Sequence, residues 1–250
     1  MKMKYWLIRL FLRLWTRKIK IVNRGKSPIQ PQSHQKYYSY FSYESISENM
    51  LKSLIRAYQS VFSEPPWEET WEEILVKEKI ENEITGKPVL TIMGGNFENP
   101  VTGFSWGSLI DTDSVAERIK SGLLTKAESV DEQKVQSIEN FLKKRSDKIL
   151  FYDEFAILSQ FRGGVDQIRF LFRPGLEMAF EHGVKQTIFW STPESKIVPL
   201  AIFMGFRPIS TIMISGKKVI FLYNSDFRSV LKIAQSMPAK KIKKIMSLFS

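Results

Sequence analysis

Residues 149–164 read ILFYDEFAILSQFRGG, and the predicted fold is organised around this stretch. Its first part is apolar, aromatic and β-branched, which predicts a buried strand. Gly163-Gly164 then turn the chain into a helical pattern from about Asp166 to His182-Gly183. A strand, a glycine turn and a helix place free amides at the positive end of a helix dipole, where the backbone can approach a phosphate closely.

Two later segments extend this pattern. Gln186–Ser191 predicts a second buried strand, and a short apolar helix from Val198 to Met204 ends at Gly205-Phe206. This order resembles the GNAT superfamily of acyl-CoA-dependent N-acyltransferases. Gln160 and Gly163 match the superfamily's acyl-CoA motif, Gln/Arg-x-x-Gly-x-Gly/Ala, and Gly205-Phe206 matches its later landmark.

The resemblance covers about Glu48 to Tyr223 and includes VFSEPPW at residues 61–67, a phrase common in the superfamily. It implies an α/β (α+β) GNAT fold, in which helices flank a mixed, mostly antiparallel sheet with splayed central strands. One departure concerns the donor site. Val165, followed by Asp166, stands where the motif has a small residue, although Gly164 can serve through a one-residue shift.

The composition limits the chemistry. A chain of 250 residues with 43% apolar residues can bury a full core as one domain. It has no cysteine, which excludes disulfides and thiol nucleophiles and fits a reducing cytoplasm, our expected location. With His34 and His182 as the only histidines, we expect no metal.

The net charge of +11 is concentrated at the two ends. Residues 1–30 carry nine Lys/Arg and residues 228–250 carry six, with no acid in either segment, so residues 31–227 hold 22 bases against 26 acids. We therefore divide the chain into a basic segment and linker (1–35), the GNAT domain (36–227) and a basic tail (228–250).

Residues 5–21 place Arg9, Arg13, Arg17 and Lys20 on one helical face, with leucine, phenylalanine and tryptophan around them. The apolar part is too short to span a bilayer. It is either an in-plane helix on an anionic membrane, which makes the protein peripheral there, or a helix packed on this domain or a second subunit. Nucleic-acid binding is less expected, because it does not need so much leucine.

The domain begins with an aromatic strand expected at Tyr37–Tyr43. Ser45 and Glu48 have capping-box spacing before a helix with a clean apolar stripe. A second, acidic helix is marked by apolar residues and tryptophan: Trp71, Ile74, Leu75 and Ile80. The resemblance implies that these helices border the acceptor site, so Trp67 and Trp71 either line that site or belong to the core.

Pro88–Met93 and Val101–Ile110 predict neighbouring strands. Residues 111–148 then insert two helical patterns, the second with a capping box at Ser129 and Glu132. This insertion is either a lid or wall of the acceptor pocket or a solvated addition. A hairpin of residues 211–214 and 218–224 closes the domain.

The resemblance also implies a donor site between the two central strands. The backbone of residues 155–157 would run along the pantetheine as an extra strand, and the amides of residues 162–165 would face the pyrophosphate. The candidate donor-binding residues are Phe155, Ala156, Ile157, Gln160, Phe161, Arg162, Gly163, Gly164 and Val165.

The reaction implied is direct attack of an amine on a thioester, which needs a base and a proton for the leaving thiolate. Asp153 and Glu154 are the candidate bases; because adjacent strand residues face opposite ways, we expect only one to serve. Ala201 stands where many members have a tyrosine that acts as the general acid. This leaves Ser191, Thr192 or water as the proton source.

We therefore expect an N-acyltransferase that uses acetyl-CoA or a longer acyl-CoA and an amine acceptor, either a small molecule or a peptide. A first alternative is fatty-acyl transfer from long acyl-CoA or acyl carrier protein to a peptide or lipidic acceptor, since that carrier is acidic and the chain's ends are basic. A second alternative is a non-catalytic binding module of GNAT fold, consistent with Val165, Asp166 and Ala201.

Overall fold

The computed structural model describes residues 36–40, 42–65, 67–84, 87–94, 101–123, 130–162, 165–195, 197–214, 216–228 and 230. The predictions for the segments 1–35 and 231–250 lie outside these residues.

The strands are β1 Lys36–Tyr40, β2 Lys87–Gly94, β3 Val101–Asp111, β4 Lys148–Ile157, β5 Thr187–Ser191, β6 Arg207–Ile214 and β7 Lys217–Asn224. The α-helices are α2 Glu48–Phe62, α3 Glu73–Glu83, α4 Val115–Leu123, α5 Glu132–Lys143, α6 Val165–Glu181 and α7 Ile197–Phe203. Three short 3₁₀ turns are η1 Tyr43–Ser45, η2 Thr112–Ser114 and η3 Ser159–Phe161.

The strands form one mixed sheet of seven in the order β1-β2-β3-β4-β5-β7-β6. Every neighbouring pair is antiparallel except β4 and β5, which are parallel. The predicted neighbours β2 and β3 and the closing hairpin β6–β7 are confirmed. The parallel pair requires a crossover, and α6 supplies it. The predicted α/β fold with a mixed, mostly antiparallel sheet is therefore confirmed.

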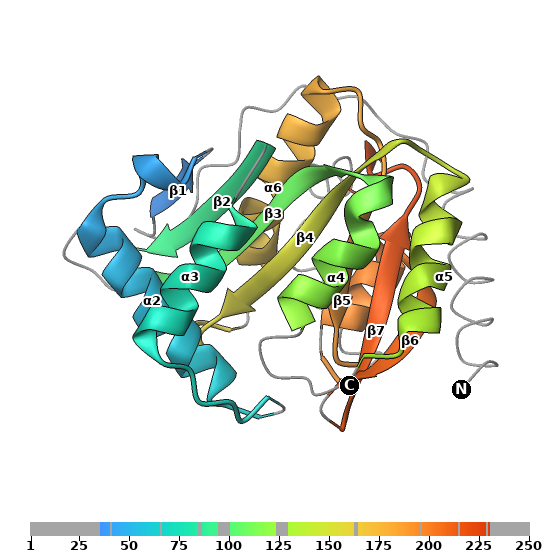
Figure 1. Cartoon of the computed structure of the whole chain (residues 1–250). Helices are drawn as coiled ribbons and strands as arrows, with labels where there is room; N and C mark the ends of the chain where they lie inside the picture. The colour runs from blue at the N-terminus through green and yellow to red at the C-terminus, as the bar shows by residue number, and fades with distance from the viewer. Residues whose placement is uncertain are drawn as a thin grey trace. The chain divides into compact units, whose positions relative to one another are not determined.

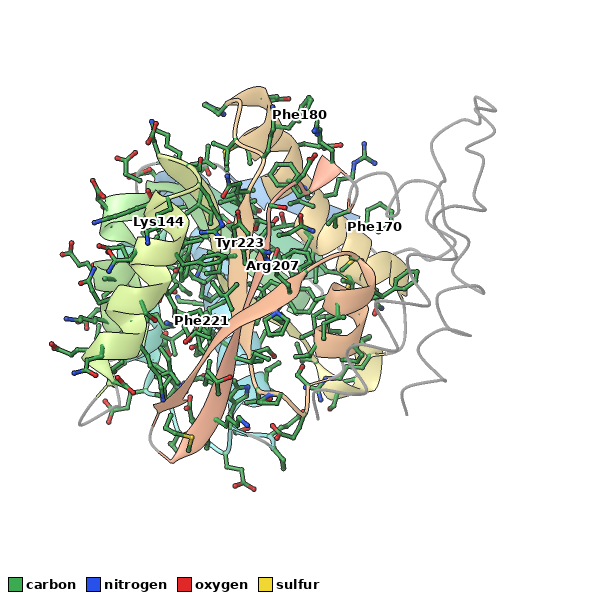
Figure 2. The ribbon with its side chains drawn as sticks, turned by 90° about the vertical axis from the view of Figure 1, so that its right-hand side faces the viewer. Lys144, Phe170, Phe180, Arg207, Phe221 and Tyr223 are labelled. Carbon is green, nitrogen blue, oxygen red and sulfur yellow. The ribbon has the colours of Figure 1, made fainter. Side chains whose placement is uncertain are left out.

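Two layers of helices cover the sheet (Figure 1). On one face, α2 and α3 pack on β2–β4, and α4 and α5 pack on β4–β7. On the other face, α6 and α7 cover the same sheet with a separate apolar cluster. Figure 2 looks onto the β6 edge, with α5 on one side of the sheet and α6 on the other. The predicted insertion thus forms two helices that cover one face of the sheet.

Helix α6 lies close to the sheet because of Gly175. A Cβ at this position would clash with the Tyr152 hydroxyl and lie 2.9 Å from Val89, so a larger residue would force a neighbour to shift. The Tyr152 hydroxyl donates a hydrogen bond to the Phe172 carbonyl at 2.6 Å. Pro174 lies inside this helix, which runs on to Glu181.

Two predicted helix starts are wrong by two residues. The N-cap of α2 is Ser47, whose hydroxyl accepts a bond from the Met50 amide, whereas Ser45 lies in η1. The N-cap of α5 is Asp131, whose carboxylate accepts from the Lys134 amide at 3.1 Å. In both cases the residue two positions after the predicted cap lies directly before the first helical turn and reaches its free amides.

Two further expectations need correction. β1 ends at Tyr40, short of the predicted Tyr43. Trp71 precedes α3, and the exposed fractions of Ile74 and Leu75 are 55% and 41%, so the buried stripe of that helix does not include them. The helix instead buries its face around Val76 and Ile80, together with two charged residues described below. Both ends of α7 and the cap Gly205 (φ 94°) agree with the sequence prediction to within one residue.

Among the residues that the structure describes, there is no helix with the length and apolar character needed to cross a bilayer.

Candidate active site

The two central strands separate part-way along their length. They pair at Leu150–Thr187, Phe151–Ile188 and Tyr152–Phe189. Beyond Tyr152, β4 continues to Ile157 and β5 continues to Ser191, but no further pairing joins them. One edge of β4, from residue 153 to residue 157, therefore faces away from β3 without a neighbouring strand among the described residues. The predicted splay is confirmed.

A β-bulge lies at the point where the strands separate. The register of β3 and β4 shifts between the pairs Gly107–Tyr152 and Trp106–Glu154, which leaves Asp153 as the extra residue. Before the bulge Phe151 packs with the α4–α5 cluster, and after it Ala156 packs with the α2–α3 cluster, on the same face of the sheet. An odd residue and an even residue thus share one face.

Asp153 and Glu154 consequently point to the same face, toward α2–α5. Both are buried, with an exposed fraction of 6% each. The expectation that adjacent strand residues face opposite ways is wrong here, because the extra residue of the bulge reverses the alternation of the strand. Two acids that a regular strand would separate are brought together.

Glu154 is held by side chains from the two N-terminal helices. Its Oε1 lies 3.3 Å from Lys79 Nζ, and the Tyr58 hydroxyl donates to the same oxygen at 3.3 Å. Lys79 also pairs with Glu83, one turn further along α3. Trp106 Nε1 donates to the other oxygen of Glu83 at 2.8 Å. Glu154 therefore belongs to a buried polar network on the α2–α3 side.

Asp153 is held by the inserted helix α4. Arg118 Nε lies 2.7 Å from Asp153 Oδ1, and Arg118 Nη2 lies 2.8 Å from Oδ2, which is a bidentate pair. Arg118 also donates to the carbonyls of Asn82 and Glu83 at the end of α3. The exposed fraction of the Arg118 side chain is 12%.

These groups form a buried charge cluster of three carboxylates, Asp153, Glu154 and Glu83, with two cations, Lys79 and Arg118. Burial raises the pKa of Asp153 to about 7, although Arg118 opposes the rise. Burial also raises the pKa of Glu154 to about 8, against the effect of Lys79 and with that of Glu83. The excess of carboxylates favours a retained proton near neutral pH, which is the range in which a general base is effective.

A small cleft opens beside this cluster. It is open to solvent, and its enclosed part has room for about one water molecule. Asp153 and Trp190 line it, and each is the first residue beyond the last paired residue of its strand, so the cleft lies where the strands part. The remaining lining comes from α3, α4, β4 and β7, on which Phe221 is labelled in Figure 2: Glu83, Arg118, Ile119, Phe151 and Phe221.

The insertion is therefore part of the cleft wall, since α4 contributes Arg118 and Ile119. Sequence reasoning did not identify Tyr58, Lys79, Glu83 or Arg118 as site residues. For two of them a signal existed: Lys79 and Glu83 fall on the same face of α3 as Val76 and Ile80, and charged residues on an apolar helical face need buried partners. Arg118 carries no comparable local signal.

The candidate donor-binding residues on β4 alternate between the two faces. Phe155 stacks on Phe172 of α6, with ring centroids 4.7 Å apart, and Ile157 packs with the α6 cluster. Ala156 packs on the opposite face. Their side chains are thus used for packing, and what remains toward the gap is the backbone edge, as the predicted pantetheine site requires.

The turn after β4 agrees less well with the predicted phosphate site. Gln160 and Phe161 lie in η3. The Arg162 amide donates to the Ser159 carbonyl at 3.2 Å, and its part in pyrophosphate binding stays a prediction. The Arg162 guanidinium donates to the Ile157 carbonyl at 2.7 Å and pairs with Glu64 at 2.9 Å.

The remaining donor-binding candidates are Gly163, Gly164 and Val165. The two glycines lie outside the described residues, as does the side chain of Val165, whose backbone begins α6. Their part in phosphate binding stays a prediction.

Ser191 is not brought together with the acids. Phe189 packs with the α6–α7 cluster and Trp190 with the α4–α5 cluster, so alternation places Ser191 on the α6–α7 face, opposite Asp153. Ala201 is fully buried in α7 and offers no proton. Neither Ser191 nor Ala201 therefore takes the place of the tyrosine that the resemblance implies.

The two tryptophans differ in their surroundings. Trp71 is buried and lies edge-on to Tyr58 in the α2–α3 cluster, which is a core position. Trp67 is partly buried and lies edge-on to Trp190, with ring centroids 5.8 Å apart. Because Trp190 lines the cleft, Trp67 lies behind one of its walls.

Across the residues with described positions, no group of three or more His, Asp or Glu side chains is arranged to hold a metal ion.

No protein-family model and no curated protein matches the chain. Solved structures share its fold. They include an apo mutant of agmatine N-acetyltransferase (TM-score 0.52, 11% identity, 75% of this chain and 98% of that chain). A polyamine N-acetyltransferase from Drosophila melanogaster gives 0.51 and 11%, covering 76% and 99%. The AHL synthase LasI gives 0.52 and 15%, covering 82% and 95%. At these identities the likeness shows the fold, and the chain has the GNAT fold.

Proposed function

We propose that the protein is an N-acyltransferase that moves an acyl group from a thioester to an amine. The observation that carries this proposal is the coincidence of three features at one point: the parallel strands part, the bulge turns two buried acids to the same face, and a cleft opens beside them. A fold alone would not support an activity, because the same fold hosts different functions.

In this reaction the amine, the thioester and Asp153 each have one role. The amine nitrogen attacks the thioester carbonyl carbon, and the nitrogen–carbon bond forms as the carbon–sulfur bond breaks. Asp153, which lines the cleft, takes the proton that the amine loses. The thiolate leaves and is protonated by water. Glu154, held by Lys79 and Tyr58, stays behind Asp153 as part of the charge cluster.

The donor is expected to lie along the open edge of β4. Backbone groups of residues 153–157 can bond to the amides of the pantetheine, as an added strand would. The turn at residues 160–165 would receive the diphosphate of an acyl-CoA. For that, Arg162 would exchange its contacts with Ile157 and Glu64 for the phosphate.

Donor binding and transfer can be tested separately. The melting temperature would be measured with acetyl-CoA, with longer acyl-CoAs and with acylated carrier protein, and acyl transfer would be followed with a panel of primary amines. We expect at least one donor to raise the melting temperature and Asp153→Asn to slow transfer by about 10²-fold or more while donor binding persists. Arg173→Met, an exposed residue paired with Glu177 on α6, is the matched control.

A second function, a non-catalytic binding module, is favoured by two observations. The Arg162 guanidinium already donates to the Ile157 carbonyl, and the buried Ala201 stands in place of the tyrosine that would act as general acid. A donor-induced rise in melting temperature without transfer to any amine would support this module instead of the enzyme.

Two further questions are the length of the transferred acyl chain and whether the protein binds a membrane surface. The basic segments 1–35 and 228–250 motivate a long acyl donor, a carrier protein or an anionic membrane surface as partner. A variant lacking residues 1–25 should float less with anionic liposomes than the full chain. Equal flotation would exclude this segment as the membrane contact.

A further inference from the structure

We propose that Arg118, supplied by the inserted helix α4, is the positioning residue for the Asp153 carboxylate, so that the insertion completes the active site. The proposal rests on the proposed function for its consequence in catalysis. The contact itself stands on geometry alone and can be tested without any activity.

The first argument is the shape of the contact. The guanidinium meets both carboxylate oxygens, through Nε at 2.7 Å and Nη2 at 2.8 Å. A bidentate pair fixes the plane of the carboxylate as well as its distance, which a single lysine contact cannot do. Asp153 is the extra residue of the bulge, so the ladder of β3 does not define its orientation. Arg118 therefore fixes the orientation of the Asp153 carboxylate, which the strand pairing does not.

The second argument is that Arg118 is itself held in place. Nη1 donates to the Asn82 carbonyl at 3.3 Å, and Nη2 donates to the Glu83 carbonyl. Both carbonyls belong to the last turn of α3, the negative end of its dipole, where a cation is favoured. The guanidinium thus joins α3, α4 and β4 at the cleft.

The third argument is that the insertion is built to place this residue. The Ala116 amide at the start of α4 donates to Glu139 of α5 at 2.8 Å. Val115 and Ile119 on either side of Arg118 are buried against α5 and the sheet. Arg118 and Ile119 both line the cleft, so α4 presents the arginine to the site while its apolar neighbours anchor the helix.

The fourth argument concerns the charges that face Asp153. Glu83 and Lys79 face it from α3, Glu154 lies next to it on β4, and Arg118 faces it from α4. Burial and Glu83 raise the pKa of Asp153, whereas Arg118 lowers it more than Lys79 does. Without Arg118, the carboxylate would lie between two acids and one more distant cation, and it would hold its proton to higher pH.

The test compares Arg118→Met and Arg118→Lys with the wild type and with Arg173→Met as the control arginine. The titration of Asp153 would be followed by carboxyl carbon NMR, with the signal assigned by its loss in Asp153→Asn. We expect the midpoint to rise by about 1 to 3 pH units in Arg118→Met and by less in Arg118→Lys. The control variant should leave it unchanged.

The same variants, together with Arg118→Ala, would be assayed for acyl transfer across pH. We expect the acid limb of the rate profile to move upward with the Asp153 midpoint, with the rate partly restored in Arg118→Ala by added guanidinium but not by sodium chloride. A purely structural arginine would lower the yield or the melting temperature without moving the limb.

The outcomes separate the two proposals. If the wild type transfers no acyl group but the Asp153 midpoint rises in Arg118→Met, the positioning contact holds and the proposed function fails. If the midpoint and the acid limb are the same in folded Arg118→Met as in the wild type, the positioning role is wrong. Should Arg118→Met not fold, Arg118→Lys decides, since an unchanged midpoint there overturns the proposal.

Discussion

The two faces of the sheet are built differently along the same strand. Toward α6 and α7, β4 presents Leu150, Tyr152 and Phe155 to an apolar cluster. Toward α2–α5 it presents Asp153 and Glu154 to a buried charge cluster. On the α6–α7 face, Gly175 and aromatic rings pack closely against β4. On the α2–α5 face, β4 buries charged side chains.

This difference shows where the fold tolerates groups that do not serve stability. Replacing buried ion pairs by apolar side chains is often neutral or stabilising, so such pairs are weak contributors to folding. Apolar packing, in contrast, is a direct source of stability. We infer that the apolar clusters on both faces secure the fold, whereas the charge cluster on the α2–α5 face serves the chemistry, and the predictions that follow test this division.

The largest effect is expected when a cation is removed from the charge cluster. Lys79→Met leaves Glu83 and Glu154 without their shared partner, and the free energy of unfolding should fall by about 3–5 kcal/mol near neutral pH. Urea denaturation would measure it. The control is Lys77→Met on the same helix, whose exposed pair with Glu81 should contribute about 0–1 kcal/mol. Equal losses in the two variants would contradict the division.

The next effect is on the pH dependence of stability. In the unfolded chain Asp153 and Glu154 titrate near 3.8 and 4.5, and in the folded protein their pKa values rise to about 7 and about 8. The folded state then binds more protons than the unfolded chain in this window, so these groups stabilise at low pH and the contribution is lost as the pH rises.

Glu154→Gln should remove its share of this dependence. The difference in the free energy of unfolding between wild type and variant, measured by urea denaturation from pH 5 to about 8, should change in favour of the variant as the pH rises. A difference that stays constant over this range would show that Glu154 does not titrate there.

A smaller effect is expected on the apolar face. Gly175→Ala places a Cβ against the Tyr152 hydroxyl, and the overpacking should cost about 1–3 kcal/mol. Tyr152→Phe removes the clashing oxygen, so the double variant should lose less than the sum of the single losses. Chemical denaturation of all three variants measures this coupling. Strict additivity would show that the helix relaxes away from the sheet instead.

The smallest effect is expected for Tyr58→Phe. The ring stays packed on Phe62, with centroids 4.3 Å apart, and only the hydrogen bond to Glu154 is lost. The free energy of unfolding should fall by about 1 kcal/mol. If the loss exceeds that of Lys79→Met, the hydroxyl and not the lysine is the main support of Glu154.

The sequence was sufficient for features that depend on local patterns. The apolar runs of β2, β3, β4 and β5 and the two helices of the insertion follow from periodicity, which records burial directly. Helix starts were less accurate, because Ser47 and Asp131 compete with equally suitable caps two residues away. The acids of β4 were identified, but as alternatives to each other.

Only the tertiary structure decided how those acids are used. The bulge at Asp153 depends on the register of β4 against β3, and no local pattern in β4 records it. Likewise, Arg118 and Asp153 are 35 residues apart and meet because α4 packs on the sheet. The sequence by itself determined which segments are buried, since burial needs only apolar side chains at the right spacing. Long-range packing decides which charged side chains are buried together, because the sequence around a carboxylate or a guanidinium does not indicate its partner.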